Sequence, residues 1–139
     1  MPNTAAEILI VDDNPYDCTL ALDALKSQPP VPRVAVVHDG AEALDYVFCT
    51  GEYADRADST PPKLVILDLH MPVMSGLEVL REIRADPVTM DIAVVVLTGG
   101  YDTDEIRQAQ KLGVTSYFLK PADFREYVDM LRVIRSKWL

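Results

Sequence analysis

Several residues with reactive side chains stand directly after short apolar runs of this chain. They are Asp12 and Asp13 after residues 7–11, Asp68 after 64–67, Thr98 after 92–97, and Lys120 after 115–119. Three carboxylates that meet at one place repel one another and raise each other's pKa unless a cation lies between them. Oxygen ligands of this kind suit Mg²⁺ or Mn²⁺. The aspartates therefore predict a divalent metal site.

The lysine and the threonine extend this prediction to phosphoryl chemistry. A divalent ion and Lys120 would neutralise the oxygens of a phosphoryl group, and the Thr98 hydroxyl would contact them. An aspartate in such a place is a competent covalent nucleophile, and Asp68 lies between the other groups. Taken singly, each residue has a more ordinary explanation as a turn, strand-end or solvated residue. The hypothesis depends on their meeting at one edge of a sheet.

Alternating strand and helix patterns would bring them to that edge. The apolar runs 7–11, 33–37, 64–67, 92–97 and 115–119 predict strands. Helix starts are predicted at Asn14, Asp39, Ser75, Asp102 and Asp123, and the last four are followed three residues later by a glutamate. Alternation of this kind predicts an α/β fold whose mostly parallel sheet has helices on both faces. Right-handed crossovers place every carboxyl end of a strand on the same edge.

Composition excludes several classes of protein. The 139 residues suit one domain, and 22 acidic against 13 basic residues give a net charge of −9, which argues against nucleic-acid binding. No run is long and apolar enough for a membrane span, and no signal peptide is recognisable, so we expect a cytoplasmic protein. Cys18 and Cys49 fall in predicted helices and are expected to be buried and reduced. The polar segment 50–63 is long for a connection and is either a functional loop or an insertion.

The joint motif resembles the receiver domains of two-component response regulators over nearly the whole chain. It comprises Asp12-Asp13, Asp68, Met71-Pro72, Gly76, Thr98, Tyr117 and Lys120-Pro121. The resemblance implies one domain over residues 1–139 with a flavodoxin-like (βα)5 fold, a doubly wound five-stranded parallel sheet in strand order 2-1-3-4-5. It also implies a signalling domain that catalyses only its own phosphorylation and dephosphorylation. Ser75, where many receivers have aspartate, and Gly100 depart from the family pattern.

The resemblance also assigns roles to residues. Asp68 would accept a phosphoryl group from a sensor histidine kinase. Asp13, Asp68 and the backbone carbonyl of His70 would bind Mg²⁺ or Mn²⁺ directly, and Asp12 would bind it through water. Thr98 and Lys120 would contact the phosphoryl oxygens, Tyr117 would move inward with Thr98 as a switch, and the Lys120–Pro121 bond would be cis.

Two further features resemble the single-domain regulators that partner bacterial phytochrome kinases, namely the 50–63 loop and the terminal Trp138-Leu139. This implies a phytochrome-type kinase as partner and output through a protein surface. Apolar residues of the last predicted helix span more than the ~100° that one buried face needs. We therefore expect a homodimer whose interface includes Tyr127, Met130, Ile134 and Trp138.

Three rival hypotheses remain at this stage. A metal-dependent phosphatase with an aspartyl intermediate would normally have a second acid at position 70, where this chain has His70. A nucleotide- or flavin-binding module would need a glycine-rich turn after the first strand, where this chain has Asp12-Asp13-Asn14-Pro15. A receiver-like module that is never phosphorylated would not need the full set of acceptor residues.

Overall fold

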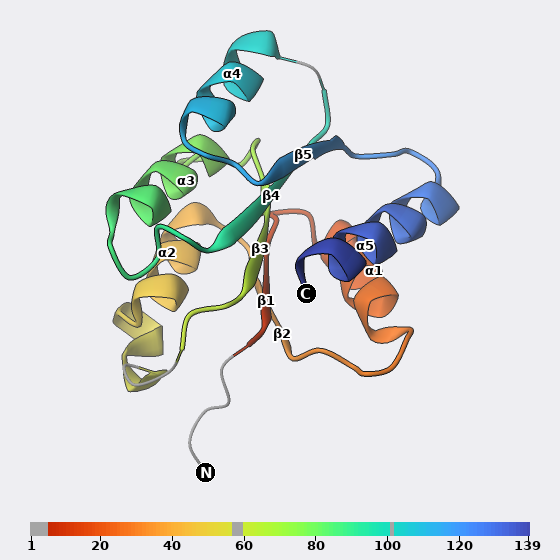
Figure 1. Cartoon of the computed structure of the whole chain (residues 1–139), viewed down its shortest axis with the longest axis horizontal. Helices are drawn as coiled ribbons and strands as arrows, with labels where there is room; N and C mark the ends of the chain where they lie inside the picture. The colour runs from red at the N-terminus through yellow and green to blue at the C-terminus, as the bar shows by residue number, and fades with distance from the viewer. Residues whose placement is uncertain (1–5, 57–59, 101) are drawn as a thin grey trace.

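The computed structural model describes residues 6–56, 60–100 and 102–139. Strands and helices alternate along the chain as predicted (Figure 1). The strands are β1 (Ile8–Val11), β2 (Val34–Val37), β3 (Leu64–Asp68), β4 (Ala93–Thr98) and β5 (Ser116–Leu119). The helices are α1 (Pro15–Lys26), α2 (Gly40–Phe48), α3 (Gly76–Ala85), α4 (Thr103–Lys111) and α5 (Phe124–Trp138), and a 3-10 helix, η1, spans Gly51–Arg56.

The strands form one parallel sheet in the order β2-β1-β3-β4-β5, which confirms the predicted topology. Val11 lies opposite Leu67 in the register of β1 and β3, and Asp68 lies opposite Leu97 in that of β3 and β4. Asp12, Asp68 and Thr98 are therefore neighbours at the carboxyl edge of the sheet.

Helices cover both faces of the sheet, α1 and α5 on one and α2, α3 and α4 on the other (Figure 1). Side chains alternate between the two cores along each central strand. Ile8 and Ile10 pack toward α1 and α5, whereas Leu9 and Val11 pack toward α2 and α3. Burial on both faces explains why the strands are continuous apolar runs.

The predicted capping residues all begin helices. Asn14, Asp39, Ser75, Asp102 and Asp123 each accept hydrogen bonds from first-turn amides. These bonds satisfy amides that have no partner within the helix. They also fix where each helix leaves the carboxyl edge of the sheet.

The segment after α2 is anchored to that helix. Arg56 is buried, stacks 3.6 Å from the centre of the Tyr46 ring and donates a 2.6 Å hydrogen bond to the Tyr46 carbonyl. Tyr53 donates to Glu42, and burial together with this bond raises the pKa of Tyr53 to about 12. Within the 50–63 segment, η1 is therefore anchored to α2 through Tyr53 and Arg56.

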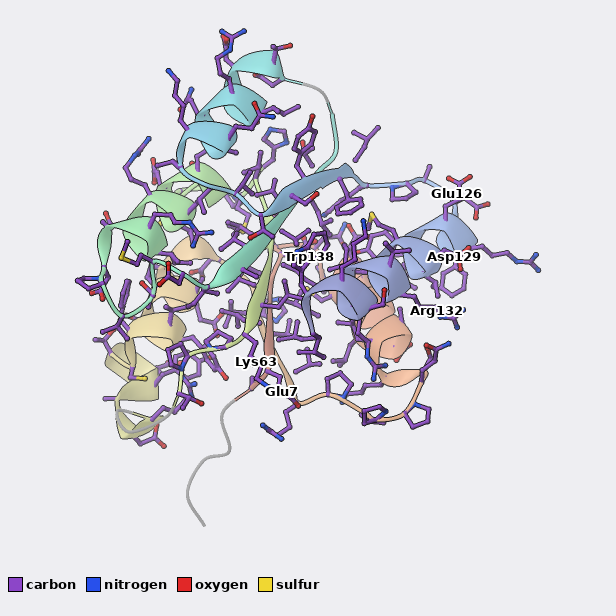
Figure 2. All side chains as sticks on the ribbon, viewed as in Figure 1. Glu7, Lys63, Glu126, Asp129, Arg132 and Trp138 are labelled. Carbon is purple, nitrogen blue, oxygen red and sulfur yellow. The ribbon has the colours of Figure 1, made fainter. Side chains whose placement is uncertain are left out.

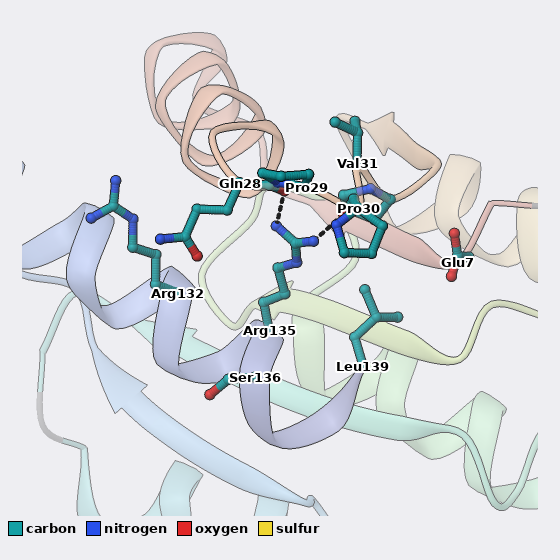
Figure 3. A pocket seen from close by; sticks show the side chains of 10 residues that line it. Glu7, Gln28, Pro29, Pro30, Val31, Arg132, Arg135, Ser136 and Leu139 are labelled. Atoms are coloured by element: carbon teal, nitrogen blue, oxygen red, sulfur yellow. Dashed lines mark hydrogen bonds between the residues drawn. The ribbon is translucent and has the colours of Figure 1, made fainter.

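Arg135 anchors the other end of the molecule. Its guanidinium donates to the carbonyls of Leu25, Gln28 and Pro30, which ties α5 to the connection between α1 and β2 (Figure 3). A pocket of about 400 Å³ lies beside this contact, lined in part by Arg132. It lies at the amino edge of the sheet, remote from Asp68.

Some predictions need correction. Cys18 is buried, but Cys49 is half-exposed and ends α2 in the left-handed region with φ 56°. The Lys120–Pro121 bond is not cis; the cis bond among the described residues joins Pro29 and Pro30. The trans form is the intrinsically favoured one for a bond to proline. No helix of the described ranges is long and apolar enough to cross a membrane.

Candidate phosphoryl-acceptor and metal site

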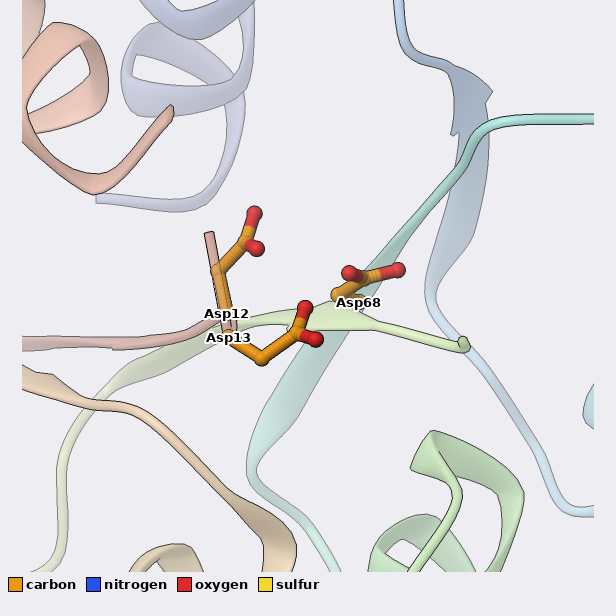
Figure 4. A group of neighbouring side chains, drawn as sticks. All are labelled: Asp12, Asp13 and Asp68. Carbon is orange, nitrogen blue, oxygen red and sulfur yellow. The ribbon is translucent and has the colours of Figure 1, made fainter. Parts of the chain in front are cut away.

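Three predicted carboxylates meet at the carboxyl edge, at the ends of β1 and β3 (Figure 4). One oxygen each from Asp12, Asp13 and Asp68 lies within 4.8 Å of the others. Asp12 and Asp68 are buried, at 3% and 6% exposure, while Asp13 is exposed. The site thus has two buried carboxylates and is open to solvent at Asp13. This arrangement suits a divalent ion that keeps several water ligands.

Lys120 extends from the end of β5 into this cluster. Its ammonium lies 2.7 Å from Asp12, 3.1 Å from Asp17 and 3.5 Å from Asp68. Burial alone would lower the pKa of Lys120, but its hydrogen bond to Asp12 and the charges of Asp68 and Asp12 outweigh burial and raise that pKa. Lys120 therefore stays positively charged beside the acidic cluster.

Asp68 occupies an unfavourable place for a negative charge. Burial raises its pKa above the usual 3.8 and the charge of Asp12 adds to the rise, whereas Lys120 and the backbone amide of His70 oppose it. That amide donates to Asp68 over 3.1 Å, while Lys120 approaches the other oxygen. Both oxygens are thus oriented by donors on either side.

The site holds four carboxylates when Asp17 is counted, and one ammonium, which contacts three of them. The excess of negative charge is the chemical reason to expect a cation here, because like charges at this spacing resist joint ionisation. The donor set contains only oxygen atoms, as Mg²⁺ and Mn²⁺ require. Asp12, Asp13 and Asp68 fit such an ion.

Thr98 and Tyr117 lie on the neighbouring strands. The buried Thr98 hydroxyl donates to the Gly100 carbonyl over 2.8 Å, so it is engaged within its own loop. Tyr117 is 38% exposed on β5. The structure thus brings Thr98 next to the cluster and leaves Tyr117 at the surface.

The chain after β3 is shaped by a glycine. A Cβ atom on Gly76 would lie 2.3 Å from the Asp68 carbonyl oxygen, a distance that real Cβ atoms do not show. The Gly76 amide instead donates to the Leu69 carbonyl over 3.0 Å. Glycine therefore lets α3 begin directly against the backbone of Asp68.

Sequence reasoning missed two residues at the site. Asp17, in the first turn of α1, contacts Lys120, and Glu105, on α4, pairs with the His70 ring over 2.6 Å. Acids in the first turn of a helix are commonly explained by the helix dipole and by capping. The spacing of Asp17 from Asn14 and Asp13 is the one signal that could have pointed to the rim of the site.

The chain was also compared with known proteins. A family model, the response regulator receiver domain, matches residues 8–132. Response regulator Rcp1 of Synechocystis sp. is 33% identical over 137 residues, which span 99% of this chain and 91% of that protein.

Two solved structures agree with this match. The phosphorylated cyanobacterial phytochrome response regulator RcpA has a TM-score of 0.89 and 35% identity, covering 97% of this chain and 94% of that one. The Mn²⁺-bound form of response regulator Rcp1 has a TM-score of 0.87 and 32% identity, covering 99% and 95%. The similarity therefore extends over nearly the whole fold.

Proposed function

Because this chain belongs to the response regulator receiver domain family, we propose that it is a single-domain response regulator phosphorylated on Asp68. Receiver domains of two-component systems take a phosphoryl group from a sensor histidine kinase. One observation carries the assignment to Asp68: its buried carboxylate, at the carboxyl end of β3, lies beside both the acidic pair and the ammonium of Lys120. The proposal treats residues 1–139 as one signalling domain and not as an enzyme with a separate substrate.

The proposed cofactor is Mg²⁺, which Mn²⁺ can replace. Asp13, Asp68 and the His70 carbonyl would hold it directly, and Asp12 would hold it through water. The clustered carboxylate oxygens support this set, as does the Mn²⁺ found in Rcp1. When bound, the ion neutralises charge on the phosphoryl oxygens.

The protein residues then have separate tasks. An oxygen of Asp68 forms the new bond to phosphorus as the bond from phosphorus to the kinase histidine breaks. Lys120 holds a phosphoryl oxygen, and Thr98 leaves the Gly100 carbonyl to hold another. Tyr117, now exposed, would follow Thr98 inward and so change the surface around β5.

The proposed partners are a histidine kinase, inferred from the relatives, and a second copy of this chain at the surface around β5. Rcp1 and RcpA are response regulators, the latter of a cyanobacterial phytochrome, which supports a phytochrome-type histidine kinase as donor. We place the protein in the cytoplasm, with output through a homodimer rather than through nucleic acid. The net charge of −9 supports the last point.

Metal dependence tests the proposal. Incubation with acetyl phosphate should phosphorylate the protein in Mg²⁺ or Mn²⁺ but not in EDTA, and Asp13→Asn should need much more metal. Asp23→Asn, an exposed acid on α1, is the control for the same change of charge. Equal phosphorylation in EDTA and in Mg²⁺ would rule out the proposed metal site.

A further inference from the structure

The ammonium of Lys120 is not shared equally among the three carboxylates that it contacts. A lysine has three N–H donors, and three carboxylates accept from this one, those of Asp12, Asp17 and Asp68. The Asp68 contact is the longest at 3.5 Å, beyond the ~2.7–2.9 Å of a strong charge-assisted bond. Lys120 is thus held mainly by Asp12 and Asp17.

These two acids are held differently. Asp12 is 5% exposed in its side chain, and its other oxygen accepts from the Asn14 amide over 2.9 Å. Asp17 is 22% exposed in its side chain, and Lys120 is its one side-chain hydrogen-bond partner among the residues with described positions. Asp12 is therefore fixed, and Asp17 is the partner that Lys120 can leave.

A phosphoryl group on Asp68 would draw Lys120 away from Asp17. It brings new anionic oxygens to the side of Asp68 that Lys120 faces, and they need a donor from the ammonium. The N–H that faces Asp68 can serve these oxygens, but the shorter bonds to Asp12 and Asp17 hold the ammonium 3.5 Å from Asp68, so a closer approach loosens one of them. The carboxylate that competes with the phosphoryl group is the one nearest solvent.

We propose that Asp17 is a positioning residue that holds Lys120 in a resting place away from Asp68 and thereby slows phosphorylation. This inference rests on the proposed function of Asp68. An ordinary alternative is that Asp17 only stabilises the first turn of α1 through the helix dipole. That role would act on the stability of the helix and would not depend on Lys120.

The rate of phosphorylation separates the two roles. Initial rates with acetyl phosphate and saturating Mg²⁺ are measured by intact mass for the wild type, Asp17→Asn and Asp23→Asn. Asp23 is an exposed acid on the same helix, so its variant has the same charge change without the lysine contact. We expect Asp17→Asn to react roughly threefold to fivefold faster, the effect of one partly exposed ion pair, and Asp23→Asn to match the wild type. An unchanged or slower Asp17→Asn protein would overturn the proposal.

A double-mutant comparison tests whether Asp17 acts through Lys120. Asp17→Asn should have no effect in a Lys120→Met background, where its partner is gone. A faster double variant than Lys120→Met alone would also overturn the proposal, because the effect would not need the lysine. A wild type that takes up no phosphoryl group would instead contradict the proposed function, and this inference would fall with it.

Discussion

The buried carboxylate of Asp68 is kept where its charge is disfavoured. Burial raises its pKa, and the charge of Asp12 acts in the same direction. The ionised form needed for attack is therefore destabilising in the folded protein without metal. The folded protein thus loses some stability by holding the ionised nucleophile in this buried position.

Asp68→Asn should raise the melting temperature in metal-free buffer at neutral pH. A raised folded-state pKa means that the folded protein holds the proton more tightly than the unfolded chain. The protonated form of Asp68 therefore stabilises the folded protein at pH values below 3.8, the usual pKa of an aspartate. This stabilisation is lost as the pH rises through the pKa of Asp68 in the folded state. The difference in melting temperature between Asp68→Asn and the wild type should therefore shrink as the pH falls toward the usual aspartate pKa. Thermal unfolding at several pH values measures this difference.

Divalent metal provides the internal check on this result. Ligand binding to the folded state alone stabilises a protein by mass action. Mg²⁺ should raise the melting temperature of the wild type and have little effect on Asp68→Asn. A variant less stable than the wild type at neutral pH without metal would show that the charge of Asp68 is well compensated by Lys120.

Site residues could be predicted from the sequence only where a strand end fixes them. Asp12, Asp68 and Thr98 come together because β1, β3 and β4 are neighbours in parallel register. Asp17 depends instead on where α1 leaves the sheet and on the reach of Lys120. That relation is between side chains of separate elements, so the local spacing of Asp17 from Asn14 and Asp13 could indicate a place near the site but not the contact with Lys120.

At the scale of elements, the junction of β3 and α3 is the tightest part of the site. The Gly76 position leaves no space for a side chain beside the Asp68 carbonyl. Gly99, which follows β4, has nothing within 4 Å of the same added atom. Substitution of alanine at each glycine therefore compares a crowded position with an open one.

Gly76→Ala should destabilise the fold, because the added methyl group must displace backbone. Overpacking of this kind costs ~1–3 kcal/mol. Gly99→Ala should leave stability nearly unchanged, since its added atom meets open space. Urea unfolding of both variants measures the difference. Equal midpoints for the two would show that the α3 junction relaxes without cost.

Helix α4 depends on few contacts. Ala109 is its one buried residue, and Glu105 joins it to His70. Arg84 of α3 donates to the Leu112 and Gly113 carbonyls just beyond its end. The caps and boundaries of α4 could be predicted from Asp102 and Gly113, but these ties could not, since they join residues distant in the sequence.

At the scale of the whole molecule, α5 has more apolar surface than its docking buries. Tyr127 and Ile134 belong to the core of their own domain, so their assignment to a dimer interface is wrong. Helix α5 has apolar residues that pack on the sheet and apolar residues that stay at the surface. The spacing of apolar residues in the sequence does not distinguish the two groups. Trp138 is half-buried against Phe118, while Glu126, Asp129 and Arg132 lie along the outer side of α5 (Figure 2).

Self-association should use the exposed residues that remain around β5 and α5. Met130 and Trp138 are half-exposed there, and Tyr117 and Leu119 are exposed at 38% and 41%. Truncation after Ser136 should weaken a dimer, whereas Val88→Glu, on an exposed apolar residue outside β5 and α5, should not. Sedimentation at tens of micromolar, with and without phosphorylation, would decide between monomer and dimer. A wild type that stays monomeric in both states would leave the homodimer without support.

The most direct test of the account is the mass of the intact protein after incubation with acetyl phosphate and Mg²⁺. The wild type should gain the mass of one phosphoryl group, and Asp68→Asn should gain none. Thermal unfolding of the same samples would establish that the variant is folded. Phosphorylation of Asp68→Asn to the level of the wild type would contradict the assignment of Asp68 as the acceptor.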